Sequence, residues 1–179
     1  MYIRQSSGHL KEELERRTLR LPLGAVQDLA KHGLKSLPEY FWRLPASSSG
    51  RFHSLEENKK AGLVLHTIRV CEAAEVLMEA WPPTFNAESV RLAAMFHDVG
   101  KYGFDEQPTE HTLKNHMRVG AKWLEEMGTW FHPPVDVLTV ACNAIRRSHG
   151  KFGPDFPVTA EDWIIHLADM FALHKERLG

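Results

Sequence analysis

Residues 93–101 read AAMFHDVGK, an apolar helical run that ends in a histidine, an aspartate and a glycine. His97 falls on the same side of this helix as the two alanines that begin the run, so its ring is expected to face the core. Neighbouring helical residues point about 100° apart, so His97 and Asp98 reach one point only near a helix end. Gly100 predicts such an end.

Apolar residues recur at helical spacing along the rest of the chain, and no segment of useful length alternates with period two, so we predict an all-α fold. Gly33 and Gly128 are expected to stop helices, and Asn86 and Thr159 to start them. The expected helices span residues 7–20, 22–32, 57–81, 87–98, from 109 or 112 to 127, 133–148 and 159–177, with a short aromatic helix or turn at 38–44.

The chain has 179 residues, the length of one compact domain. Its clearest loop is PASSSGRFHS, residues 45–54, which is rich in serine, glycine and proline. We therefore expect a short helical N-terminal extension over residues 1–45 and one main domain, a helical bundle, over residues 46–179.

Composition restricts the possible partners. Lys and Arg number 22 against 23 Asp and Glu, so no overall basic field holds nucleic acid nonspecifically. The N-terminus lacks the apolar run of a signal peptide, and no stretch approaches the roughly 18 apolar residues of a membrane span. Cys71 and Cys142 lie in apolar helical patterns typical of reduced, buried thiols. We expect a cytoplasmic protein without a membrane partner.

The chain has eleven histidines, which is well above ordinary usage, and imidazole is the commonest transition-metal ligand in proteins. Polar residues interrupt the apolar faces or ends of five expected helices: His66, His97 with Asp98, His116, His149 and Asp169. Each histidine alone is more simply a hydrogen-bonded core residue, and each aspartate could cap a helix or pair locally. Two inward aspartates with no inward Lys or Arg nevertheless predict a bound cation. His and Asp together suit Mn, Fe, Co, Ni or Zn.

The run AAMFHDVGK, with His66 upstream and Asp169 downstream in IIHLADMFALH, resembles the HD-domain superfamily of metal-dependent phosphohydrolases, whose signature is H…HD…D. His116 and His149 stand where the binuclear members carry two further histidines. The resemblance covers residues 50–178 and implies that the main domain, residues 46–179, is an HD phosphohydrolase domain. Residues 1–45 match no family.

Within the superfamily, three segments look most like the HD domain of bacterial 3′-to-5′ exoribonucleases. They are GLVLHT at residues 62–67, TEHTLKNH at 109–116 and SHGKFG at 148–153. Those enzymes carry an additional nucleic-acid-binding domain, and this chain has no strand-rich segment or basic stripe to replace it. The expected substrate is therefore a small phosphoester or nucleotide, with short nucleic-acid ends as a further candidate.

The resemblance implies a first divalent metal held by His66, His97, Asp98 and Asp169, with Asp98 bridging to a second metal held by His116 and His149. The nucleophile would be a metal-bridging hydroxide that attacks phosphorus. Asp98 and Lys101 are the expected catalytic residues, and Lys101 would neutralise charge on the phosphoryl oxygens. A lysine near a helix C-terminus is also favoured by the helix dipole alone.

Four residues are candidates for substrate contact: His53, His111, Arg146 and Lys151. A place behind the metal ligands suits His53 better than direct substrate contact, and a solvated helix end suits Arg146 and Arg147 better. Two other functions keep the same fold. Some relatives bind two irons and activate oxygen, and a non-catalytic signalling or structural module is a third hypothesis. Ligand residues alone do not separate hydrolase from oxygenase, but a silent module has no chemical need for all six.

Overall fold

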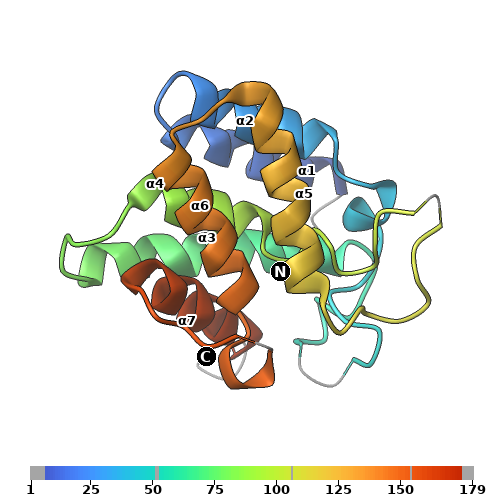
Figure 1. Ribbon diagram of the computed structural model, residues 1–179. Coiled ribbons are helices and arrows are strands. Elements are labelled where there is room, and N and C mark those ends of the chain that lie inside the picture. The colour runs from blue at the N-terminus through green and yellow to red at the C-terminus, as the bar shows by residue number, and fades with distance from the viewer. Residues whose placement is uncertain (1–6, 51–52, 106, 154, 175–179) are drawn as a thin grey trace.

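The computed structural model describes residues 7–50, 53–105, 107–153 and 155–174, and every regular element in these ranges is helical (Figure 1). The α-helices are α1 Ser7–Arg17, α2 Ala25–Lys35, α3 Gly62–Ala80, α4 Ala87–Phe96, α5 His116–Phe131, α6 Val135–Arg147 and α7 Ala160–His174. Three short 3-10 helices accompany them: η1 Thr18–Arg20, η2 Glu39–Trp42 and η3 Gly150–Phe152. The prediction of an all-α helical bundle is confirmed.

Helix α3 lies in the middle of the bundle, between α7 on one side and α1 on the other, and α6 packs against α4, α5 and α7 (Figure 1). One apolar core runs through the molecule and takes fully buried side chains from five helices: Leu14, Leu29, Leu63, Phe96 and Ile145. The N-terminal helices therefore share the core of the remaining chain. The boundary near residue 45 stays a prediction.

Two predicted helix stops were wrong. Helix α2 continues through Gly33 to Lys35, and α5 continues through Gly128 to Phe131. A Cβ atom on Gly33 would lie 2.8 Å from the ring of Phe96, and one on Gly128 would lie 2.4 Å from the side chain of Leu138. These glycines therefore allow close packing between helices, a role that spacing along the chain does not reveal.

Three predicted helix starts were also wrong. The helix expected from residue 22 begins at Ala25, after Gly24 with φ of 120°. The helix expected from residue 57 begins at Gly62, because Ala61 adopts a left-handed conformation with φ of 63° and ends a preceding turn. Helix α5 begins at His116 and not at Thr109 or Thr112. The starts at Asn86 and Thr159 are confirmed by side-chain caps, and the predicted end of the last helix near residue 177 lies outside the described residues.

The N-terminal segment braces the turn that follows α4. The buried Tyr40 hydroxyl, in η2, donates a hydrogen bond to the carbonyl of Val99, and the Tyr102 hydroxyl donates to the carbonyl of Pro45 at 3.1 Å. Val99 is the residue next to Asp98. A segment outside the expected main domain thus holds the backbone beside a candidate metal ligand.

Replacing Tyr40 with Phe is expected to destabilise the protein by about 1–3 kcal/mol, because it leaves the buried Val99 carbonyl without this donor. Urea unfolding measures the effect. Ser47→Ala removes a hydroxyl whose hydrogen bonds to Ser49 are exposed to solvent and is the control, with an expected change within about 0.5 kcal/mol. Equal stability of the Tyr40→Phe variant and the wild type would show that water replaces the lost donor.

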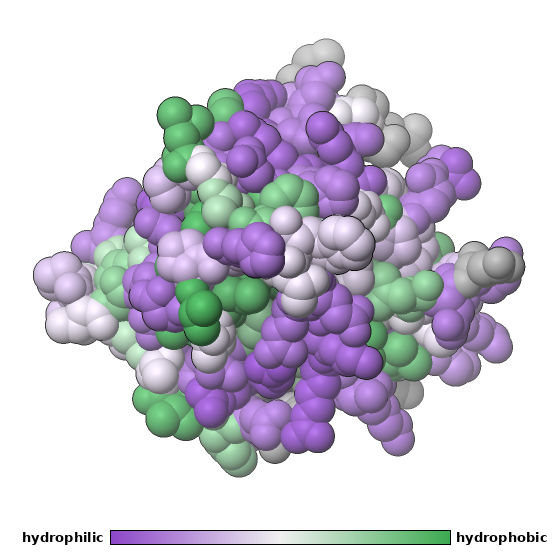
Figure 2. All heavy atoms as spheres, turned by 45° about the horizontal axis from the view of Figure 1, so that its top comes forward, coloured by the Kyte–Doolittle hydropathy of each residue, from purple (hydrophilic) through white to green (hydrophobic). Residues whose placement is uncertain are grey.

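The helices, the surface and the thiols each bear on the expectations from composition. Among the described residues, no helix combines the length and the apolar composition needed to cross a membrane. Figure 2 brings the α1 and α2 side forward, and the described residues of this face are mainly hydrophilic with separate apolar patches. Cys71 and Cys142 are free and buried, as predicted, and burial raises the pKa of each thiol to about 12.

Candidate metal centre

The structure brings the six predicted ligand residues to one place from five helices or their ends. His66 comes from α3, His97 and Asp98 follow α4, His116 opens α5, His149 follows α6, and Asp169 comes from α7. Five of the six are buried, and His149 has a side chain that is 23% exposed. Solvent therefore reaches the cluster beside His149.

A first group of donor atoms surrounds one oxygen of Asp98. His66 Nε2 lies 3.0 Å from Asp169 Oδ1, 3.5 Å from His97 Nε2 and 3.7 Å from Asp98 Oδ2. His97 Nε2 lies 3.5 Å from the same Asp98 oxygen. The donor atoms of His66, His97 and Asp98 all lie within 4.8 Å of one another, which is close enough for one ion to contact them all.

A second group surrounds the other oxygen of Asp98. His116 Nε2 lies 3.2 Å from Asp98 Oδ1, and the rings of His116 and His149 have centroids 4.7 Å apart. Donor atoms of Asp98, His116 and His149 also lie within 4.8 Å of one another. His149 Nε2 is 3.6 Å from Asp169 Oδ2. Asp98 thus presents one carboxylate oxygen to each group, as a ligand shared by two ions would.

The proton positions of two imidazoles fit metal binding. His97 Nδ1 lies 3.0 Å from the carbonyl of Ala94, and His116 Nδ1 lies 2.6 Å from the carbonyl of Leu113. Because each Nδ1 donates its proton to a carbonyl, each Nε2 carries a lone pair. His116 Nε2 and Asp98 Oδ1 are buried acceptors without a hydrogen-bond partner. A cation satisfies both atoms, so the residues fit a divalent metal.

Glycine packing brings Asp98 and His116 together. A Cβ atom on Gly100 would lie 2.6 Å from the carbonyl oxygen of His116 and 2.7 Å from the amide nitrogen of Gly120. The turn after α4 therefore rests directly on the backbone of the first turn of α5. Leu113 also donates its amide to the carbonyl of Lys101 at 2.9 Å, which ties the α5 approach to the same turn.

The expectation that no basic residue points inward was wrong. Lys101 is only 4% exposed, and its Nζ lies 2.5 Å from Asp98 Oδ2. The turn at Gly100 bends the chain back, so that a lysine three residues after Asp98 meets its carboxylate. Charge imbalance around Asp98 alone is therefore a weaker argument for a cation than the sequence indicated.

Glu57 belongs to the centre, and the sequence analysis missed it. Its carboxylate is fully buried and accepts a hydrogen bond from Arg69 at 2.8 Å. Its Oε2 lies 3.1 Å from His53 Nδ1 and 3.6 Å from His66 Nδ1. In sequence Glu57 looks like an exposed residue at a helix start. The one sign of a buried acid nearby is Arg69, which interrupts an apolar part of α3.

Buried acids outnumber buried bases in this centre. Of the three carboxylates of the centre, Asp98 pairs with Lys101 and Glu57 pairs with Arg69, whereas Asp169 meets only histidines among the ion pairs of the described residues. Because an unpaired buried carboxylate is costly, the remaining negative charge favours a bound cation or a protonated histidine.

The pKa values assign that proton to His66. Burial lowers the pKa of this histidine, but the Asp169 and Glu57 carboxylates more than offset burial and raise it to about 9. Burial lowers the pKa of His97, and burial lowers the pKa of His149 to about 4. His97 and His149 therefore offer lone pairs at neutral pH, whereas a metal at His66 must displace a proton.

The predicted substrate residues divide into two sets. The ring of His53 lies 4.6 Å from that of His66, so His53 does reach the centre. His111 and Lys151 are exposed, and Lys151 lies over the ring of Phe152. Arg146 binds Glu125 at 2.5 Å, so its guanidinium already has an acidic partner. The neighbouring Arg147 is similarly engaged, because it binds Asp162 at 2.8 Å.

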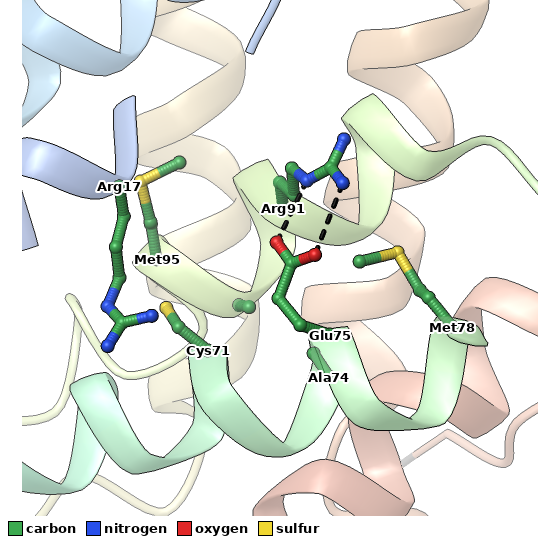
Figure 3. Close-up of a pocket in the computed structure, with 8 residues that line it drawn as sticks. Arg17, Cys71, Ala74, Glu75, Met78, Arg91 and Met95 are labelled. Carbon is green, nitrogen blue, oxygen red and sulfur yellow. Dashed lines mark hydrogen bonds and ion pairs between the residues drawn. The ribbon is translucent and has the colours of Figure 1, made fainter. Parts of the chain in front are cut away.

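A separate cavity lies between α1, α3 and α4, where Figure 3 shows Arg17, Cys71 and Met95 around the ion pair of Glu75 with Arg91. Arg91 Nε donates to Glu75 Oε1 at 2.9 Å. The cavity has a volume of about 10 Å³, which is room for a single water molecule. It does not compete with the histidine cluster as a substrate site.

In the comparison with protein families, a family model described as HD domain matches residues 63–173. This range is more than half of the chain and contains all six clustered ligand residues. Comparisons with curated proteins and with solved structures found no significant match.

Proposed function

Since this chain belongs to the HD-domain family, whose members are commonly metal-dependent hydrolases, we propose that it hydrolyses a phosphoester bond of a nucleotide or short oligonucleotide. The observation that carries the proposal is the position of Asp98. One of its oxygens faces His66 and His97, and the other faces His116. A carboxylate shared in this way suits a pair of divalent cations, and such a pair is a common catalyst of displacement at phosphorus.

Divalent cations bound here would lower the pKa of a water to make it a nucleophile, and would stabilise negative charge on the phosphoryl oxygens. The chain supplies the positioning. Main-chain carbonyls fix the rings of His97 and His116, so their lone pairs need no reorganisation on binding. Lys101 holds Asp98 through a buried ion pair and adds positive charge beside the reacting phosphoryl group.

We propose a small substrate because the basic side chains near the end of α6 are already paired with acidic residues. Arg146 and Arg147 bind acidic partners, and the net charge of the chain is -1. Long RNA would need a basic track that these residues do not form. We further propose that the resemblance of residues 109–116 and 148–153 to exoribonuclease HD domains extends to the substrate, which would then be a nucleotide or an oligonucleotide end. We also propose that residues 1–45 are an extension that braces the HD domain through Tyr40.

The proposal is tested by hydrolysis of bis-p-nitrophenyl phosphate under anaerobic conditions, with Mn, Co, Ni or Fe added to metal-stripped protein. We expect metal-dependent release of nitrophenol without oxygen, which also separates a hydrolase from an oxygenase. The His97→Ala and Asp169→Ala variants should lose both metal and activity. Retention of full metal content and full activity in these two variants would overturn the assignment.

Replacing His116 with Ala is expected to remove about one metal equivalent of two, because His116 contacts only the second group. Metal analysis after gel filtration gives the stoichiometry, and the hydrolysis assay should show a large loss of rate. Loss of both equivalents would instead reveal a single coupled site. The matched control is His132→Ala, which removes an exposed histidine at the other end of α5 and should change neither quantity.

A further inference from the structure

The ring orientation of His66 has a different origin from that of its neighbours. His97 and His116 direct their Nδ1 protons to main-chain carbonyls. His66 Nδ1 is buried and has no hydrogen-bond partner, and the acceptor that faces it is Glu57 Oε2 at 3.6 Å. One candidate ligand of the centre therefore depends on a side chain for its orientation, and a substitution can remove that side chain.

We propose that Glu57 is the positioning residue of His66: when a metal binds at Nε2, Glu57 Oε2 closes the 3.6 Å gap to His66 Nδ1, accepts its proton in a hydrogen bond and so holds Nε2 toward the carboxylates of Asp98 and Asp169. The inference rests on the proposed function, because it assigns His66 to a metal. A carboxylate behind a metal-bound imidazole typically fixes the tautomer and strengthens the ligand. Glu57 lies outside residues 63–173, so the family match does not assign it this role.

The turn before α3 positions the Glu57 carboxylate beside His66. The carbonyl of Glu57 accepts the amide of Ala46 at 2.8 Å, and a Cβ atom on Gly62 would lie 1.7 Å from the same carbonyl oxygen. Glycine at position 62 therefore lets the turn press against the start of α3. This close approach puts a residue nine positions before His66 in sequence next to its ring in space.

Arg69 holds the Glu57 carboxylate in place. Its Nη1 donates to Glu57 Oε1 at 2.8 Å and to the hydroxyl of Ser54 at 2.8 Å, which leaves Glu57 Oε2 for the histidines. Arg69 Nη2 binds a second acid, Glu56, at 2.8 Å. The two neighbouring glutamates thus share one arginine, but the structure gives only Glu57 a contact with His66.

This arrangement supplies a matched pair of variants. Glu57→Gln and Glu56→Gln each remove one negative charge from Arg69, and only the first removes the carboxylate that faces His66. The readout is the affinity for Zn²⁺, measured by calorimetric titration of metal-stripped full-length protein. We expect Glu57→Gln to bind the first equivalent about 10- to 100-fold more weakly than the wild type. Glu56→Gln should match the wild type within about twofold.

The double variant Glu57→Gln/Arg69→Gln separates positioning from the loss of a structural ion pair. In Glu57→Gln alone, the Arg69 guanidinium stays buried and has one acidic partner fewer. The double variant removes this guanidinium as well. Affinity that stays low in the double variant supports the proposal. Affinity that returns to the wild-type value overturns it, because the unpaired arginine would then account for the loss.

A spectroscopic measurement tests the tautomer directly. In ¹⁵N-histidine-labelled protein loaded with Zn²⁺, we expect His66 to carry its proton on Nδ1, and this proton should exchange faster with solvent in Glu57→Ala. Equal Zn²⁺ affinity of the wild type and both single variants would overturn the role of Glu57 while leaving the proposed hydrolase intact. A wild type that binds no Zn²⁺, Mn²⁺ or Co²⁺ would overturn the proposed function and this inference together.

Discussion

Replacing Asp98 with Asn is expected to abolish binding of both metals and to lower phosphodiester hydrolysis about a thousandfold or more. Asp98 is a member of both donor groups, so its loss affects both ions at once. Metal stabilisation of transition-state charge is worth several kcal/mol, and each 1.36 kcal/mol is about tenfold in rate. Metal analysis and the nitrophenyl assay measure the two losses.

The Asp98→Asn variant also leaves Lys101 buried without its carboxylate, which destabilises the fold by itself. The double variant Asp98→Asn/Lys101→Met removes both charges and should fold, as urea unfolding will show, while still failing to bind metal. Asp136→Asn changes an exposed aspartate at the start of α6 and serves as the charge control. A folded double variant that keeps two metals would show that Asp98 is not a metal ligand.

Replacing Gly100 with Ala is expected to destabilise the protein by about 1–3 kcal/mol or more and to lower occupancy of the second metal group. The added Cβ would lie 2.6 Å from a carbonyl oxygen and 2.7 Å from an amide nitrogen of α5. Backbone atoms in a helix cannot rotate away as a flexible side chain can, so the turn itself must move. That movement separates Asp98 from His116.

Urea unfolding and metal stoichiometry together test this prediction. Gly24→Ala is the control: the site has open space but a positive φ of 120°, so it should lose some stability and bind metal normally. If Gly100→Ala bound two metals with unchanged affinity, the packing of the turn against α5 would not be what aligns Asp98 with His116.

Much of the candidate centre was predictable because each ligand is marked locally. His66 and Asp169 interrupt apolar helical faces, and the His97-Asp98 pair ends a buried helix, so periodicity alone marks them as inward. The same periodicity determined the all-α fold. Helix ends were less predictable: Gly33 and Gly128 have the residue type of a stop but serve as contact points for Phe96 and Leu138.

The sequence did not identify Glu57 as part of the centre, and it named Lys101 as a catalytic residue without predicting that its side chain is buried against Asp98. Both are charged, and both occur at a helix end or turn, where a charged residue is ordinarily solvated. Glu57 is buried because a backbone turn folds against Gly62, and Lys101 is buried because the turn at Gly100 packs on α5. Neither packing contact leaves a periodic pattern in the sequence.

By itself, the sequence determined the helical class, the inward faces and six candidate ligands, because these depend on residue spacing within single helices. Only the tertiary structure decided that the ligands form two groups sharing Asp98, that Lys101 pairs with it and that Glu57 stands behind His66. Such partnerships arise from contacts between segments distant in sequence. Steric fit at a few glycines, rather than hydrophobic periodicity, sets which backbone segments meet.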